Sequence, residues 1–172
     1  LAADLWRRNG DVAEAHARLD EALAKQPGIA RLWQLRLAFE PAVGDGAKTV
    51  VDRWLDAMPD HLEALESAMH LHETRGDIEA VDALAQRIVE LEPGRASGEI
   101  RVLERLCREQ PEAAIAHAQA LLDKAGDEGA RRFLRTWLGY AQDRAGRHGE
   151  AVTTWSAINA EEAGRRWPLT VP

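Results

Sequence analysis

Apolar residues recur along most of this chain at the spacing of a helix face. Leu19, Ala22 and Leu23 share one such face, and residues 81–88 repeat the pattern, because positions three and four apart lie on the same side of an α-helix. The sequence lacks the alternating runs of β-branched residues and the Asn-Gly turns that indicate β-hairpins. The pattern therefore predicts an all-α protein.

Glycine and proline divide this pattern into ten predicted helices, arranged as five consecutive pairs. The loops between them are short, so neighbouring helices are expected to run antiparallel. The predicted helices span residues 1–9 and 11–25, 29–40 and 44–57, 61–75 and 77–91, 96–109 and 111–124, and 128–145 and 147–163.

The breaks between pairs recur about every 33 residues. Pro27, Pro59 and Pro93 each follow an apolar helical stretch, and Gly126 stands where the next proline would fall. Such a period is typical of stacked helix pairs, because one pair cannot bury its apolar face alone. We expect repeat units at about 1–27, 28–59, 60–93, 94–126 and 127–163. An extended tail or linker is expected over 164–172, where prolines disfavour a helix.

The turns within the pairs carry residues that suit helix ends. Gly10, Gly76 and Gly146 are expected to supply a positive φ, and Asp11 or Asp77 can then cap the following helix. The turn inside the second unit is expected to be irregular, since it contains three helix-breaking residues: Pro41, Gly44 and Gly46.

These residues resemble the tetratricopeptide repeat, a helix pair of about 34 residues with the pattern W-x₂-L-G-x₂-Y, then A-x₃-F, then P. The fifth unit is similar in Leu138, Gly139, Gly146, Ala151 and Trp155. The first is similar in Trp6, Gly10, Ala15, Leu19, Ala22 and Pro27, and the third in Leu65, Gly76 and Pro93. The second and fourth match mainly in spacing. The resemblance implies a right-handed αα superhelix of about five pairs.

Residue size along the repeats indicates how the helices pack. Small residues such as Ala15 and Ala151 are expected to let the two helices of a pair approach closely. Larger side chains are expected to fill the spaces between pairs: Trp6, Leu19, Phe39 and Trp155.

Composition narrows the classes of partner. Of the 172 residues, 45% are hydrophobic and 30% charged, which is typical of a folded protein. The net charge of −7 argues against a nucleic-acid partner, which usually requires a basic face. No apolar run approaches the roughly 20 residues of a membrane span. We expect a soluble, cytoplasmic protein. The periplasm stays open because Leu1 lies inside a helical pattern without an initiator Met, which suggests a fragment whose native N-terminus is missing.

Few residues offer catalytic or metal-binding chemistry. The single cysteine, Cys107, lies on an apolar stripe and is expected to be a small buried hydrophobe. His70 and His72 are two positions apart and would point to different sides of a helix, so they cannot share a metal. Nucleophile elbows and phosphate-binding Gly-rich loops are missing from the sequence. We therefore expect no enzymatic activity, no cofactor and no metal in this region.

The resemblance also implies that the first helix of each pair lines a concave groove. The residues that it places there are Trp33, Leu37, Glu63, Glu66, His70, Glu73, Arg101, Arg105, Arg108, Phe133, Thr136 and Tyr140. The three arginines fall on one helical stripe, and the glutamates and histidine fall on another.

These features predict a non-catalytic scaffold that binds a peptide or partner helix in its groove. Arginines would pair with carboxylates, and aromatic residues would anchor the partner. In an alternative interpretation, the acidic and basic stripes pair with each other between adjacent helices. Two other roles stay open. One is an accessory domain that positions substrate for a larger enzyme, such as a bacterial sulfotransferase or glycosyltransferase. The other is self-association through the terminal helices.

Overall fold

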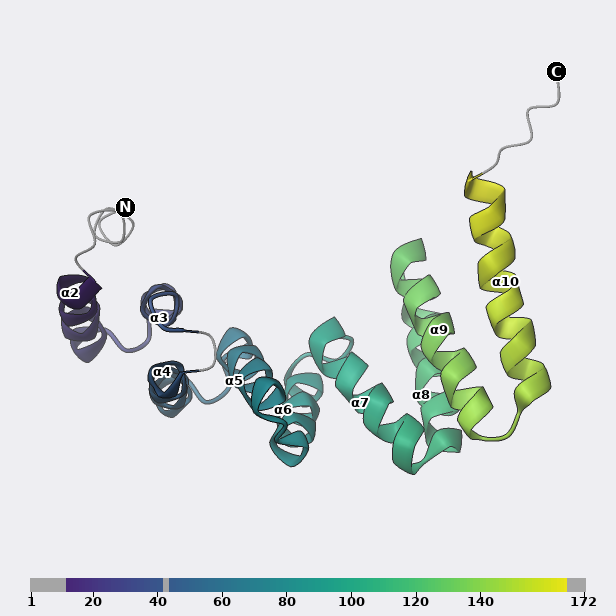
Figure 1. The fold of residues 1–172 in the computed structure, drawn as a ribbon, viewed down its shortest axis with the longest axis horizontal. Helices are drawn as coiled ribbons and strands as arrows, with labels where there is room; N and C mark the ends of the chain where they lie inside the picture. Colours follow the sequence, from purple (N-terminus) through teal and green to yellow (C-terminus); the bar gives the residue numbers. More distant parts are fainter. Residues whose placement is uncertain (1–11, 42–43, 167–172) are drawn as a thin grey trace, which may run out of the picture. The chain divides into compact units, whose positions relative to one another are not determined.

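The computed structural model describes residues 12–41 and 44–166, which form nine α-helices and no strand (Figure 1). The helices are α2 (Val12–Lys25), α3 (Ala30–Leu37), α4 (Asp45–Ala57), α5 (Leu62–Arg75), α6 (Ile78–Leu91), α7 (Ala96–Glu109), α8 (Pro111–Lys124), α9 (Glu128–Arg144) and α10 (His148–Arg166). The all-α helical repeat fold is thereby confirmed. The predicted helix over 1–9, with Trp6, Gly10 and Asp11, lies outside the described residues.

Most helices begin and end within one residue of their predicted bounds, with two exceptions. Helix α3 ends at Leu37 instead of residue 40, because Pro41 disfavours helical backbone at the residue before it and a turn forms over 38–40. Helix α10 continues to Arg166, three residues beyond the predicted end. Residues 164–166 are therefore helical and not part of an extended tail, and residues 167–172 lie outside the described part.

The predicted helix-end residues act as expected where the structure describes them. Gly76 and Gly146 have φ values of 74° and 77°, a conformation that L side chains rarely adopt. The Asp77 carboxylate accepts a hydrogen bond from the backbone N–H of Ala80 at 3.2 Å and caps α6. Asp127 caps α9 in the same way, a role not anticipated from the sequence.

The irregular turn inside the second repeat unit, residues 28–59, has a specific cause. Gly46 lies inside the first turn of α4 and not in the loop before it. A Cβ atom at this position would overlap the carboxylate of Glu40, so the glycine leaves room for that side chain.

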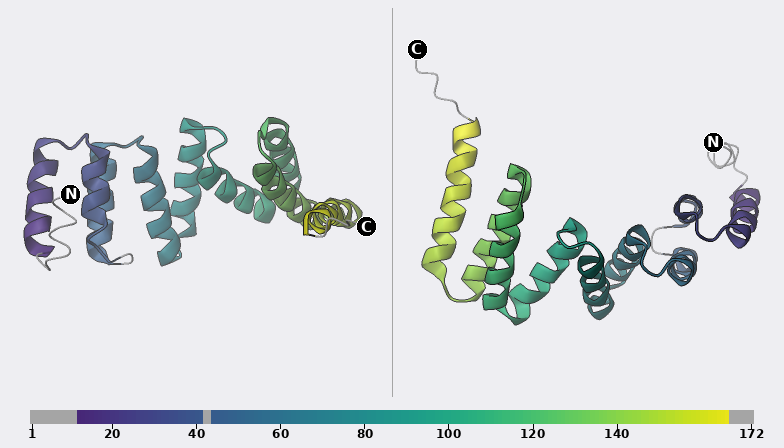
Figure 2. Two further views of the ribbon diagram at one scale, coloured as in Figure 1. Left: turned by 90° about the horizontal axis from the view of Figure 1, so that it is seen from above. Right: turned by 180° about the vertical axis from the view of Figure 1, so that it is seen from behind.

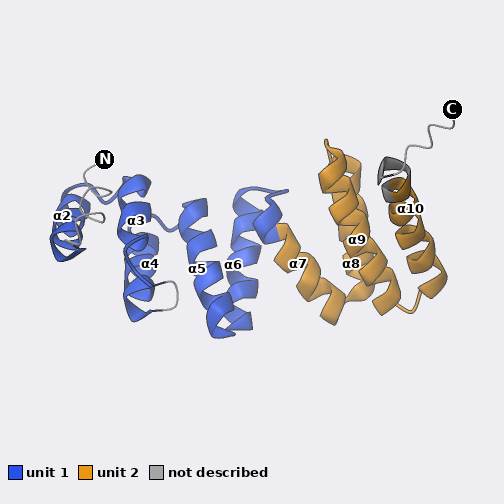
Figure 3. Ribbon diagram, turned by 45° about the horizontal axis from the view of Figure 1, so that its top comes forward, with its two compact units in different colours: residues 1–98 blue, residues 99–172 orange. Residues whose placement is uncertain are grey.

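The chain divides into two compact units, residues 1–98 and residues 99–172 (Figure 3). The boundary falls within α7, whose first three residues belong to the first unit. In both units, consecutive helices pack side by side (Figures 1 and 2). None of the helices in residues 12–41 and 44–166 combines the length and apolar character needed to cross a membrane.

The core of the first unit extends across α2, α3, α4, α5 and α6. Trp54 is its largest fully buried side chain, with 1% of its surface exposed. Leu23, Trp33, Val50 and Ala64 pack with it. A second cluster joins α4 to α5 and consists of Ala47, Val51, Ala68 and Leu71.

The core of the second unit lies between α7, α8, α9 and α10. Its two clusters are Cys107, Ala114, Ile115 and Ala141, and Leu103, Ala118 and Leu134. Cys107 is buried, as expected. Ala151 is also buried, like Ala15 in the first unit, which confirms that small residues occupy these close contacts.

Candidate functional site

The twelve residues predicted to line the groove divide equally between the two units. Six belong to α3 and α5 in the first unit, and six belong to α7 and α9 in the second. A single groove through both sets stays a prediction, because each unit is a separate compact body.

Trp33 is a core residue, which corrects its assignment to the groove. Only 3% of its surface is exposed. Its indole N–H donates a hydrogen bond to the carbonyl of Pro27 at 2.7 Å, and the Arg53 guanidinium lies 5.6 Å from the ring centroid. Because the ring is enclosed by its own unit, Trp33 stabilises the fold and offers no anchor to a partner.

Leu37 and His70 do share a surface of the first unit. Both line a hollow of about 240 Å³ between α3, α4 and α5, together with Glu40, Ala47, Val51, Ser67 and Leu71. Leu37 is half-buried against the core, and His70 is exposed and lies 3.6 Å from the Glu73 carboxylate.

The predicted acidic stripe is engaged in contacts within the first unit. Glu66 accepts hydrogen bonds from Arg95 at 2.8 and 3.0 Å and from the Ser97 hydroxyl at 2.5 Å. The hydrogen bond from Arg95 holds the pKa of Glu66 below its usual value, against the opposing effect of burial. Glu63 accepts a hydrogen bond from the Gln34 amide. Glu66 therefore ties α5 to the start of α7.

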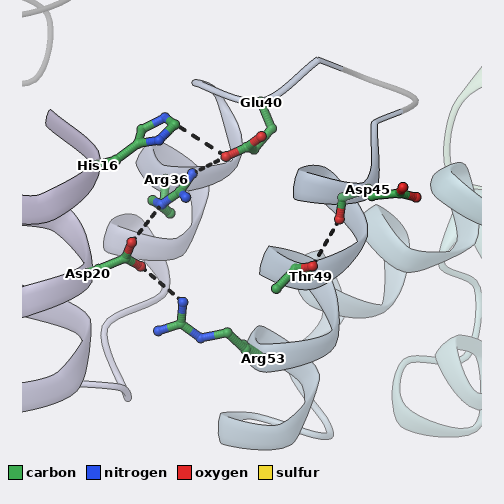
Figure 4. Close-up of polar contacts among 7 residues, drawn as sticks. All are labelled: His16, Asp20, Arg36, Glu40, Asp45, Thr49 and Arg53. Atoms are coloured by element: carbon green, nitrogen blue, oxygen red, sulfur yellow. Dashed lines mark hydrogen bonds and ion pairs between the residues drawn. The ribbon is translucent and has the colours of Figure 1, made fainter. Parts of the chain in front are cut away.

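A second polar network, not anticipated from the sequence, joins α2, α3 and α4 (Figure 4). Asp20 accepts hydrogen bonds from Arg36 at 3.4 Å and from Arg53 at 3.0 Å. Arg36 also pairs with Glu40, and His16 lies 3.9 Å from the same carboxylate. The Arg36 and Glu40 side chains are about nine-tenths buried, so this network has a structural role in the first unit.

The predicted arginine stripe lies on α7 in the second unit. Arg101 donates a hydrogen bond to Glu104, three residues along the same helix, at 2.6 Å. Arg105 is half-buried, whereas Arg108 is exposed and lines a hollow in the surface.

That hollow is the first of two neighbouring hollows in the surface of the second unit. It lies between α7 and α9, has a volume of about 440 Å³ and is lined by Glu104, Cys107, Arg108, Trp137, Tyr140 and Arg144. A neighbouring hollow of about 440 Å³ lies between α9 and α10 and is lined by Thr136, Tyr140, Trp155, Ile158 and Asn159. Tyr140 stands between the two. We call this pair of hollows the aromatic trough.

Four aromatic rings follow one another on α9 and α10, and all but Phe133 line the aromatic trough. The ring centroids of Phe133 and Trp137 are 6.3 Å apart, those of Trp137 and Tyr140 are 5.8 Å apart, and those of Tyr140 and Trp155 are 5.6 Å apart. Tyr140 is 52% exposed and Phe133 is 38% exposed. Phe133, Thr136 and Tyr140 therefore lie on one accessible surface, and their place in a groove stays a prediction.

Trp137, Arg144 and Trp155 complete the aromatic trough but were not predicted to line it. A signal for two of them was present. Trp137, Tyr140 and Arg144 are spaced by three and four residues, which places them on one face of α9.

Cys107 forms part of the trough floor and is only 7% exposed. Burial raises the pKa of its thiol, while the nearby charges of Arg144 and Arg108 act in the opposite direction. The thiol is therefore protonated at neutral pH and poorly suited to act as a nucleophile. Both guanidinium groups lie near this one sulfur atom.

The described residues contain no group of three or more His, Cys, Asp or Glu side chains that could hold a metal ion. His72 instead lies 3.0 Å from the Asp77 carboxylate, at the end of its own helix.

Comparison with known proteins shows the fold. No family model matches the sequence, and no curated protein matches it. Among solved structures, one of MamA has a TM-score of 0.68 at 16% identity, covering 99% of this chain and 93% of that one. The nearly identical TPR-like repeats of a Podosopora anserina protein give 0.61 at 19%, covering 96% and 93%.

A third similar structure is a tetratricopeptide repeat protein from Parabacteroides merdae, with a TM-score of 0.56 at 15% identity, covering 92% of this chain and 62% of that one. Together these similarities confirm the tetratricopeptide-repeat fold that the sequence pattern predicted.

Proposed function

We propose that this chain is a non-catalytic scaffold that binds a partner protein through the aromatic trough. The observation that carries the proposal is the exposure of Tyr140, 52% accessible between two tryptophan rings at the junction of two hollows. Protein interfaces are enriched in Tyr, Trp and Arg, and the aromatic trough contains all three.

The packing of the rings supports this role. Trp137 contacts the core of the second unit, and Trp155 lies against the backbone of Gly139. Tyr140 packs against both rings. Because the platform is held in place before binding, a partner would lose little conformational freedom of the trough side chains.

The form of the hollows favours a protein segment as ligand. Both are open depressions between neighbouring helices, suited to one or two apolar side chains of a partner helix or extended segment. The charged rim of the α7–α9 hollow, with Arg108 and Arg144, would orient that segment.

Affinity capture tests the proposal. The purified chain, its Tyr140→Ala variant and an Ile78→Ala control are immobilised, and proteins retained from a lysate of the source organism are quantified by mass spectrometry. Ile78 is 54% exposed in the first unit, so the control removes an equally exposed apolar side chain elsewhere. We expect the retained amount of the specific partner to fall about tenfold with Tyr140→Ala and to stay unchanged with Ile78→Ala, because only the first variant removes an interface anchor. Equal capture by all three proteins would refute the assignment.

A further inference from the structure

Arg144 has an unusual position among the arginines of this fold. It is the last residue of α9, and its side chain lines the aromatic trough. Arg36, Arg95 and Arg147, by contrast, each pair with a carboxylate of another helix or turn. Within the described residues, Arg144 has no carboxylate at ion-pair distance, so its charge is available to a ligand.

The positive charge of Arg144 is opposite in sign to the net charge of the chain. The sequence carries a net charge of −7. The α7–α9 hollow contains two arginines and one glutamate, and Arg101 pairs with that glutamate, Glu104, at 2.6 Å. Arg144 thus presents a positive charge within an acidic protein, beside the apolar walls of the hollow, which lower the local dielectric constant.

This arrangement selects for one ligand chemistry. A guanidinium group binds a carboxylate through two parallel hydrogen bonds, and the interaction strengthens when aromatic rings exclude water. A basic segment would face like charge at Arg144, whereas an acidic segment would find a partner for its carboxylate there. An acidic ligand is therefore directed to the trough.

We propose that the aromatic trough recognises protein segments in which an apolar side chain is flanked by aspartate or glutamate, with Arg144 binding a carboxylate and Tyr140 contacting the apolar side chain. The inference rests on the proposed function and adds the chemistry of the partner. Arg108 lines the same hollow from α7.

Three synthetic peptide libraries test this inference. Each places one Leu or Phe at the centre of a nine-residue peptide, flanked by Asp and Glu in the first library, by Asn and Gln in the second, and by Lys and Arg in the third. Binding of fluorescent peptides to the full chain is measured by anisotropy. We expect the tightest binders in the acidic library, with affinity falling as salt rises from about 50 to about 500 mM.

Charge variants make the test specific. Arg144→Gln should weaken the binding of acidic peptides about tenfold, as expected for loss of a charged hydrogen-bonded contact. Arg144→Glu should shift the preference toward the basic library, a change that a merely structural role would not produce. Lys124→Gln, which removes a positive charge at the end of α8 and outside the trough, should leave affinity unchanged. Circular dichroism verifies that each variant is folded.

The outcomes separate this inference from the proposed function. If neutral peptides bind as tightly as acidic ones and Tyr140→Ala weakens both, the trough is a docking site but the charge selection is refuted. If no library binds, the recognition of acidic segments is refuted. The proposed function is then still decided by the affinity capture that compares the wild type with Tyr140→Ala. If Arg144→Gln instead abolishes self-association measured by sedimentation, a second copy is the occupant and the inference is overturned.

Discussion

At the scale of single residues, the absence of one side chain shapes the aromatic trough. A Cβ atom at Gly139 would overlap the indole of Trp155, the ring against which Tyr140 packs. Helix α10 can therefore approach α9 closely only because position 139 has no side chain. The position of the Trp155 ring, and through it part of the trough wall, depends on this contact.

Gly139→Ala should consequently destabilise the protein by about 1–3 kcal/mol, because the indole or the helix must move to accommodate a methyl group. Thermal unfolding followed by circular dichroism would measure the loss. Gly149→Ala is the matched control, since a Cβ atom there would meet no heavy atom within 4 Å. It lies in α10 and should raise stability slightly or leave it unchanged. Equal melting temperatures for both variants would argue against the close contact.

Residue roles were harder to predict than residue burial. Periodicity identified Leu19, Cys107 and Ala151 as packed positions, since burial follows directly from the helical pattern. It could not separate Trp33 from Trp137, because both are tryptophans on the first helix of a predicted pair. Trp33 is enclosed by α2 and α4, whereas Trp137 borders an open hollow. That difference depends on contacts between segments distant in the sequence.

At the scale of secondary-structure elements, the contact between Glu66 and Arg95 connects α5 to the residue preceding α7. The Glu66 side chain is 26% exposed and accepts two hydrogen bonds from one guanidinium group. Such bidentate contacts fix orientation better than single ones do. They hold the first residues of α7 in place within the first unit, where Gly98 also packs against Ile88 and Val89 of α6.

Glu66→Gln should lower stability at pH 7 by about 1 kcal/mol, as expected for a partly buried ion pair. The pKa of Glu66 is lower in the folded chain than in the unfolded chain. The stabilisation is therefore complete at neutral pH and is lost as the pH falls through the folded-state pKa. Melting temperatures of the wild type and the variant should converge as the pH falls below the folded-state pKa of Glu66, and a constant difference across pH would contradict the assignment. Glu21→Gln, at an exposed pair with Lys25, should show a smaller effect.

The helix bounds were largely predictable from the sequence, and the two exceptions have physical reasons. Pro41 shortens α3 by restricting the residue before it, an effect that reaches back along the chain. Helix α10 passes through Gly164 because one glycine costs a helix only about 1 kcal/mol and does not end it.

At the scale of the whole molecule, the chain consists of two compact units and not one continuous core. In repeat proteins each helix pair contacts mainly its neighbours, so stability is a sum of local terms. A substitution should therefore destabilise its own unit most. The sequence revealed the repeats but gave no indication of the boundary near Gly98, because that boundary reflects the density of contacts and not a change in composition.

Ala151→Leu should test this locality. Ala151 is 1% exposed, so a larger side chain would overpack its contact by about 1–3 kcal/mol. Hydrogen exchange measured by mass spectrometry should show faster exchange in α9 and α10, with little change in α4 and α5. A uniform increase across all helices would indicate that the two units unfold as one.

The burial of Cys107 in the floor of the aromatic trough has a practical consequence. It is the only cysteine of the chain, so any thiol reagent reports on this one place. Because burial raises the pKa of the thiol, alkylation in the free protein is slow and depends on local opening of the floor. A ligand seated above the sulfur would slow it further. The alkylation rate of Cys107 can therefore report whether the trough is occupied, without any change to the sequence.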